Sequence, residues 1–258
     1  MPDRSLSSPR ILAVGGLDPC GGAGITADAR MAGAIGVHAL TVATCQTVQS
    51  RHGFEGLHLT PVELLRECLR VAFADGPVHA IKLGLVGAPA TLRVVLEFVS
   101  DHSSTTPVIA DPVLGATSGG LEAGEDLVRE YLTSLDKITV LTPNLPELDR
   151  LAPAGASQLV AGGCPNVFIT GGHGSGAIVE DRLVTNAGEV TIRHPRLDIG
   201  PVHGTGCALA SAVAAHMALG DSVEEACRHA VADLVESLRR TPDSSDGFPV
   251  PLSIAASR

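Results

Sequence analysis

One short run of the sequence combines an anion-binding geometry with a reactive side chain. His203-Gly-Thr-Gly-Cys207 leads directly into an apolar stretch that reaches Leu219 and predicts a long helix. The first backbone N–H groups of a helix have no partner within the helix, and glycines let a phosphate approach them closely. Cys207 falls in that first turn, where we expect a thiol to be acidified. The run suits phosphoryl transfer, although an ordinary helix start with a buried cysteine has the same pattern.

A second glycine-rich segment, residues 16–24, separates the first predicted strand from its helix. It is too rich in glycine for a simple turn, and Asp18 within it could accept a hydroxyl; a structural loop is the alternative. No G-x-x-x-x-G-K-[ST] run occurs in the chain, which excludes a P-loop kinase. Gln49 ends the next strand, and its amide can donate and accept at the edge of a heterocycle or simply face solvent.

Polar residues also follow three later strands. Asp111 suits a metal or a water-mediated phosphate contact, or a loop cap. Asn144 and Glu147 have the spacing of a capping box, and Glu147 could alternatively lie near Mg²⁺ and phosphates. Thr170 precedes two glycines with free backbone N–H groups. His173 and His203 lack the spacing of a metal site.

The elements that position these residues alternate between strand and helix. Such alternation predicts an α/β fold with a mostly parallel sheet, helices on both faces, and ligands at the carboxyl ends of the strands. Ser222 and Glu225 form a second capping-box pattern. Strands are expected at 10–16, 39–48, 79–86, 107–113, 138–142 and 166–170, helices at 25–35, 61–74, 90–99, 126–135, 204–219 and 222–239, and short antiparallel strands at 177–179, 182–185 and 190–193. Residues 1–9 and 241–258 are expected to be irregular tails of a single domain spanning 1–258.

Composition excludes several classes of protein. The formal net charge is −10, and the chain has no basic block, so nucleic acid is not an expected partner. No run of about 18 apolar residues predicts a membrane span. The six cysteines are scattered without a C-x-x-C, which argues against zinc fingers and a disulfide framework. The first residues lack the apolar core of a signal peptide, and we expect a reducing cytoplasm.

Six motifs in this order resemble those of the hydroxymethylpyrimidine/phosphomethylpyrimidine kinase family, within the ribokinase-like superfamily, from about Ile11 to Leu238. The matching motifs are Asp18-Pro-Cys-Gly-Gly-Ala-Gly24, Lys82-Leu-Gly-Leu-Val-Gly87, Asp111-Pro-Val113, Thr142-Pro-Asn-Leu-Pro-Glu147, Gly171-Gly-His173 and His203-Gly-Thr-Gly-Cys207. The resemblance implies a three-layer α/β/α fold, ATP with Mg²⁺, a homodimer, and phosphorylation of 4-amino-5-hydroxymethyl-2-methylpyrimidine and then of its monophosphate in thiamine biosynthesis.

The resemblance also assigns roles to individual residues. Those expected to bind the pyrimidine are Gly16, Asp18, Ala23, Gln49, Leu85 and Val113. Those expected to bind ATP or its phosphates are Asn144, Glu147, Thr170, Gly172 and Thr205, with Asp111 and Glu147 near Mg²⁺, through water or directly. The expected catalytic set is Gly204, Thr205 and Gly206 as the anion hole and Cys207 as the base, where related sugar kinases have Asp.

The sequence departs from the family pattern at several points. Cys20 replaces a frequent Ser, Leu85 replaces Met, and the segment 148–164 is short. Thr170 stands where many members have Lys, which weakens the expectation of the second phosphorylation. A pyridoxine/pyridoxal kinase is an alternative because the ring and hydroxymethyl group are similar in size. A non-catalytic pyrimidine-binding module is another, against which Cys207, Asp111 and Glu147 count.

Overall fold

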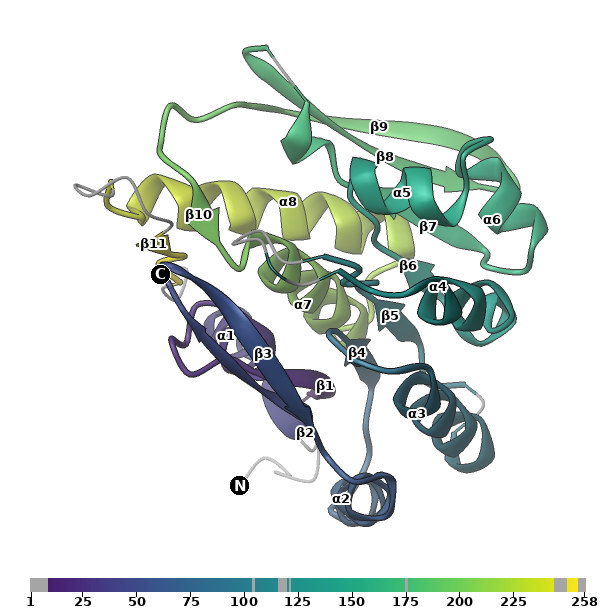
Figure 1. Cartoon of the computed structure of the whole chain (residues 1–258). Coiled ribbons are helices and arrows are strands. Elements are labelled where there is room, and N and C mark those ends of the chain that lie inside the picture. Colours follow the sequence, from purple (N-terminus) through teal and green to yellow (C-terminus); the bar gives the residue numbers. More distant parts are fainter. Residues whose placement is uncertain are drawn as a thin grey trace, which may run out of the picture.

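A nine-stranded sheet forms the middle layer of the molecule, in the order β3-β2-β1-β4-β5-β6-β7-β8-β9 (Figure 1). The structure is a computed structural model that describes residues 9–103, 105–115, 120, 122–174, 176–243 and 250–254. The strands are β1 Arg10–Leu17, β2 His38–Ser50, β3 Gly53–Leu59, β4 Ala80–Leu83, β5 Val108–Ala110, β6 Val140–Leu141, β7 Asn166–Ile169, β8 Ile178–Thr185 and β9 Gly188–Pro195. A separate parallel pair joins β10 Val202–His203 to β11 Val250–Pro251.

Within this order, the six neighbouring strands β2-β1-β4-β5-β6-β7 pair in parallel. Strand β3 at one edge, and strands β8 and β9 at the other, pair antiparallel. Helices cover both faces, so the expected mostly parallel, three-layer α/β/α arrangement is confirmed. The helices are α1 Gly24–Ile35, α2 Val62–Ala74, α3 Pro89–His102, α4 Glu125–Leu132, α5 Leu145–Leu151, α6 Ser157–Ala161, α7 Thr205–Ala218 and α8 Val223–Arg240, with short 3₁₀ turns η1 Leu135–Lys137 and η2 Gly171–His173.

Two apolar cores lie on opposite faces of the sheet. Successive side chains of a strand point to opposite faces, and in β1 Leu12 and Val14 join one core while Ile11 joins the other. The first core includes side chains of α2 to α6, and the second includes those of α1, α7 and α8. Figure 1 shows these two groups of helices on opposite sides of the sheet. Helix α7 is buried on nearly all sides, and its many alanines let α1, α8 and the sheet approach it closely.

The structure corrects several expected elements. Strand β3 was not expected; it folds back on β2 as an antiparallel hairpin, with Phe54 opposite Gln49. The two short strands expected at 177–179 and 182–185 fall within one continuous strand, β8, which begins at Ile178. Strand β11 interrupts the tail expected to be irregular, whereas residues 1–8, 244–249 and 255–258 lie outside the described residues.

Both expected capping boxes are confirmed. Asn144 and Glu147 cap α5 reciprocally, and Ser222 and Glu225 do the same for α8. Within the described part of the chain, no helix is both long enough and apolar enough to cross a membrane.

Candidate active site

A pocket lies at the carboxyl ends of the parallel strands, and the first turn of α7 forms part of its wall. All the expected pyrimidine-binding residues line it, namely Gly16, Asp18, Ala23, Gln49, Leu85 and Val113. Asp111, Asn144, Glu147, Gly204, Gly206 and Cys207 line it as well, together with Gly24, Thr47, Phe54, Gly115 and His203. Residues separated by up to 191 positions, from Gly16 to Cys207, therefore meet at one site.

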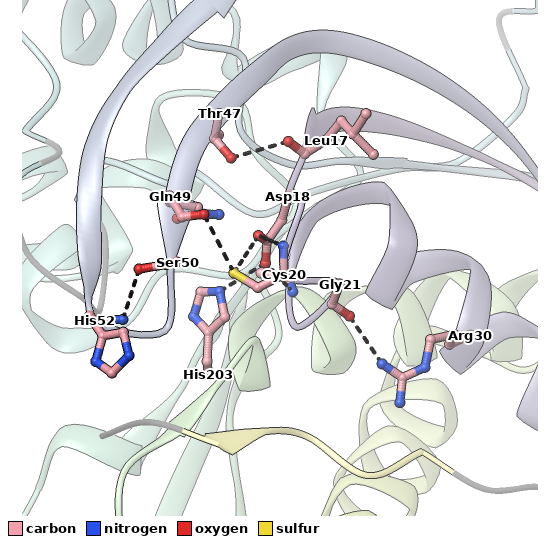
Figure 2. A network of polar contacts seen from close by, with 11 residues as sticks. Leu17, Asp18, Cys20, Gly21, Arg30, Thr47, Gln49, Ser50, His52 and His203 are labelled. Carbon is pink, nitrogen blue, oxygen red and sulfur yellow. Dashed lines mark hydrogen bonds and ion pairs between the residues drawn. The ribbon is translucent and has the colours of Figure 1, made fainter. Parts of the chain in front are cut away.

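The loop between β1 and α1 is fixed by the carboxylate of Asp18 (Figure 2). Its Oδ1 accepts hydrogen bonds from the backbone N–H and the thiol of Cys20, at 2.9 and 2.8 Å. Its Oδ2 accepts from the Ala23 N–H at 2.9 Å and lies 3.0 Å from Nε2 of His203. Burial raises the pKa of Asp18, but these hydrogen bonds outweigh it and hold the pKa far below its usual value. Asp18 therefore joins the first loop to the segment before α7 as an anion.

A close backbone approach places this loop against the start of α7. Gly204, the N-cap of α7, has φ +88°, a conformation that side chains with a Cβ rarely adopt. A Cβ added at Gly204 would also collide with the carbonyl oxygen of Gly22. Gly204 makes no side-chain cap, so the first N–H groups of α7 stay available to an anion in the pocket.

The Cys207 thiol is not acidified, and the expectation from its place in the helix is wrong. Burial raises the pKa of Cys207 to about 12; the nearby Lys82 ammonium lowers it, while the carboxylates of Asp111 and Asp28 raise it further. Desolvation and the two carboxylates outweigh the Lys82 ammonium and the backbone hydrogen bond from Gly24, which both lower the pKa. The thiol lies near Asp111 and lowers the pKa of that carboxyl.

A buried ionic cluster lies directly behind the pocket. The Lys82 ammonium on β4 contacts Asp28 on α1 and, at 4.0 Å, Asp111. Ser211 on α7 donates a hydrogen bond of 2.7 Å to Asp28. Burial lowers the pKa of Lys82, but Asp28, Cys207 and Asp111 raise it more, so Lys82 is a cation. Sequence reasoning did not single out the pair with Asp28, because its partners come from separate elements with no motif of their own.

Two carboxyl groups, Asp111 and Glu147, face the pocket opposite the first loop. Glu147 accepts hydrogen bonds from the backbone N–H groups of Leu114 and Asn144, at 3.2 and 3.0 Å. Burial, and then repulsion by Asp111, raise the pKa of Glu147 to about 7 against those hydrogen bonds. Burial also raises the pKa of Asp111. Two buried oxygen ligands that repel one another fit a divalent cation such as Mg²⁺, which would relieve the repulsion.

The expected phosphate-binding residues that follow β7 do not line the pocket. The Thr170 N–H donates to the Pro143 carbonyl at 3.0 Å, which joins the end of β7 to the residue before Asn144. The next amide, of Gly171, donates to buried Asp181 on β8 at 2.7 Å. Gly172 has open space around its Cα. Thr205 is likewise outside the pocket lining, although its neighbours are part of it.

Phe54 and His203 are pocket residues that sequence reasoning gave no role. Phe54 reaches the pocket only because β3 pairs with β2. The sequence does not predict this strand, because Gly53 and Gly56 weaken the strand propensity of the run Gly-Phe-Glu-Gly-Leu-His-Leu. His203 belonged to the recognised motif, but its contact with Asp18 spans 185 residues and has no local signal.

The sequence matches known proteins over most of its length. The family described as phosphomethylpyrimidine kinase matches residues 18–250. The hydroxymethylpyrimidine/phosphomethylpyrimidine kinase of Streptomyces coelicolor is 35% identical over 89% of this chain and 88% of that protein. The thiamine biosynthesis multifunctional protein ThiED of Corynebacterium efficiens is 35% identical over 92% of this chain, which spans only 33% of that longer protein.

Solved structures share the fold at lower identity. The pyridoxal kinase of Staphylococcus aureus in complex with AMP-PCP and pyridoxal aligns with a TM-score of 0.85 and 22% identity, over 95% of this chain and 93% of that one. The phosphomethylpyrimidine kinase of Clostridium difficile aligns with a TM-score of 0.76 and 24% identity, over 88% of this chain and 98% of that one. These likenesses establish a ribokinase-like fold.

Proposed function

The chain belongs to the phosphomethylpyrimidine kinase family, and we propose that it uses ATP to phosphorylate 4-amino-5-hydroxymethyl-2-methylpyrimidine and then its monophosphate, in thiamine biosynthesis. The observation that carries this proposal is that the uncapped first turn of α7, with Cys207, opens into the same pocket as Gln49. An anion site and a site for a heterocycle edge are thereby adjacent. The chain matches curated kinases of this name across nearly their full length, which supports the substrate class.

The pyrimidine ring would lie between the first loop and the end of β2. Gln49 would exchange two hydrogen bonds with the ring edge, because its amide both donates and accepts. Leu85, Val113 and Phe54 provide the apolar walls of the same pocket. The hydroxymethyl group would then face Cys207 and the N–H groups of α7, where the transferred phosphoryl group carries its charge.

Cys207 acts as the partner of the substrate hydroxyl in this proposal. The transition state of phosphoryl transfer is loose in most analyses, and catalysis rests on positioning and charge stabilisation. The hydroxyl proton therefore need not leave before the transfer, and a thiol with a pKa of about 12 can orient the hydroxyl without first being ionised. Lys82 beside it offsets negative charge that gathers during transfer.

Asp111 and Glu147 are the residues that would hold Mg²⁺, directly or through water. The cation would supply charge neutralisation for the phosphates of ATP. Asn144, Thr170 and Gly172 would bind the ATP phosphates from the side of β6 and β7. This assignment follows their shared place at the carboxyl ends of those strands, next to the pocket.

Product analysis by mass spectrometry tests the proposal. The purified chain is incubated with the hydroxymethylpyrimidine and MgATP, and the monophosphate and then the diphosphate are expected. Monophosphate alone after exhaustive incubation would contradict the second step, and Thr170→Lys would then test whether the missing positive charge is the reason. No ADP release with any candidate alcohol would favour a non-catalytic binding module.

Pyridoxal kinase activity is the second candidate. Its support is that pyridoxal kinases align with TM-scores of 0.84 to 0.86, against 0.76 for a phosphomethylpyrimidine kinase. The relatives named hydroxymethylpyrimidine/phosphomethylpyrimidine kinase are 31–35% identical to this chain, which favours the first candidate. Offering pyridoxal and the pyrimidine in competition, at equal concentrations, separates the two by which phosphate forms.

We also infer a cytoplasmic homodimer. The exposed apolar side chains Val48 on β2 and Leu59 on β3 lie on the edge hairpin, where a second copy would bury them. Light scattering after size-exclusion chromatography measures the mass; a monomer at micromolar concentration would contradict this assembly.

A further inference from the structure

A cluster of histidine and aspartate side chains lies at the turn between α7 and α8, outside the residues that line the pocket. His216 belongs to the last turn of α7, Asp221 to the connecting turn, and His229 to α8. Oδ2 of Asp221 lies 3.3 Å from Nδ1 of His216 and 2.7 Å from Nδ1 of His229. The three ligand atoms lie within 4.8 Å of one another.

A fourth residue fixes the orientation of this cluster. Nε2 of His216 lies 2.8 Å from Oδ2 of Asp233 on α8. When Nε2 donates its proton to Asp233, the lone pair of Nδ1 faces Asp221 and is free to bind a metal. A carboxylate on the far nitrogen of a histidine is the usual outer-shell support of a zinc ligand.

We propose that His216, Asp221 and His229 bind a zinc ion, with water completing the coordination. Two imidazole nitrogens and one carboxylate form a donor set that zinc accepts, and that Mg²⁺, which prefers oxygen, does not. With zinc–ligand bonds of about 2.0–2.2 Å, ligands of a tetrahedral site lie about 3.3–3.5 Å apart. The separation of 3.3 Å between His216 and Asp221 already matches that spacing. The 2.7 Å hydrogen bond between Asp221 and His229 must lengthen to reach it.

The surroundings favour a cation and permit its entry. The carbonyl end of α7 carries partial negative charge, and His216 lies in its last turn. The side chain of His216 is 14% exposed, whereas that of His229 is 56% exposed, so the ion would enter on the side of His229. The site would tie α7 to α8. His216 lies nine residues after Cys207, or about 13.5 Å along α7 at 1.5 Å per residue. The site is structural and independent of the proposed kinase activity.

Zinc titration of the chelator-treated full chain tests the proposal. Isothermal titration calorimetry should give one site that Asp221→Asn and His229→Gln each weaken at least 10-fold. His38→Gln, at an exposed histidine at the start of β2, is the matched control and should leave binding unchanged. Zinc should also raise the melting temperature of the control but not of the His229 variant. Equal affinity in all four proteins would overturn the proposal.

A second histidine-containing group in the described part of the chain must be distinguished from the proposed site in this titration. Asp18, Cys20 and His203 also place ligand atoms within 4.8 Å of one another. Cobalt substitution distinguishes them, because a Cys20 thiolate adds a sulfur-to-metal charge-transfer band and the proposed site has no sulfur. The spectrum without that band, lost in His229→Gln and kept in Cys20→Ser, is the expected result. A thiolate band with loss of binding in Cys20→Ser would overturn the assignment.

Discussion

Lys82 and Asp28 form a fully buried ion pair, with the ammonium nitrogen 2.9 Å from Oδ1 of the carboxylate. The pair joins β4 to α1 beneath the pocket, and Asp111 shares the same cation at 4.0 Å. A single buried ammonium thus offsets negative charge from two carboxyl groups, one structural and one facing the ligand. Loss of either partner leaves an uncompensated charge away from water.

Removal of the Lys82 ammonium should destabilise the fold. Lys82→Met should lower the free energy of unfolding by about 3–5 kcal/mol, the usual cost of breaking one side of a buried pair. The double variant Lys82→Met with Asp28→Leu should recover much of that loss. Urea denaturation measures both. Arg228→Ala, which breaks an exposed pair with Glu224, is the control and should change stability little. A single variant as stable as the wild type would contradict a charged Lys82.

Cys207 should react slowly with iodoacetamide while the pocket is empty. Its raised pKa keeps the thiol protonated near neutral pH, whereas Cys68 on α2 is exposed and should be alkylated first. Peptide mass spectrometry over a time course gives the order of modification. Faster labelling of Cys207 than of Cys68 would contradict a raised pKa and support the acidified thiol that the position of Cys207 in the helix alone predicts.

Cys207 should nonetheless matter for turnover. Cys207→Ala removes the group that orients the substrate hydroxyl and should reduce kcat about 10²-fold, the usual cost of misplacing a reacting group. The fold should persist, because alanine is a good helix former. Circular dichroism checks the fold, and a steady-state ADP-release assay gives the rate. Near-normal turnover would make Cys207 a packing residue and leave the chemistry to the anion hole.

Activity should rise with pH through about 7 as Glu147 ionises. Its pKa is raised to about 7, and only the carboxylate form attracts Mg²⁺. The midpoint belongs to the pair with Asp111, because the two groups titrate together. Glu147→Gln should lower kcat/KM about 10–100-fold and remove this limb of the pH profile. An unchanged limb would assign the titration to another group.

Ionisation of Glu147 should lower the free energy of unfolding, although it raises the activity. The unfolded chain loses the Glu147 proton near pH 4.5, whereas the folded protein keeps it until about 7. Between these values the folded state binds more protons, so stability falls as the pH rises and is not recovered above that window. Urea denaturation across this range should show the slope in the wild type and a weaker slope in Glu147→Gln.

Gly204→Ala should abolish activity through the backbone contact with Gly22. Gly204 and Gly220 both have positive φ, at +88° and +102°, so alanine strains both positions. At Gly220, nothing lies within 4 Å of an added Cβ, whereas at Gly204 the carbonyl of Gly22 blocks it. The difference in residual activity between the two variants, measured by ADP release, therefore isolates the close approach. Equal effects would mean that strain alone accounts for the loss.

Much of the site could be predicted because its motifs are local. Strand–helix alternation places the ends of β1, β5 and β6 at one edge of the sheet, and Gly16, Asp111 and Asn144 do meet there. The pKa of Cys207 could not be predicted in this way. Its pKa is raised by burial and by the carboxylates of Asp111 and Asp28, which come from elements distant in the sequence. Phe54 was missed for a related reason: β3 forms by pairing with β2, not from its own propensity.

The contact between Asp18 and His203 has a consequence for synthesis of the chain on the ribosome. The two residues are 185 positions apart. Gly22 and Gly204 approach each other at the same junction, between the β1–α1 loop and the start of α7. The nascent chain can form β1, β2 and β4 long before it contains the segment that closes the pocket. Ligand therefore cannot stabilise early folding intermediates, and it can assist only after α7 has left the exit tunnel.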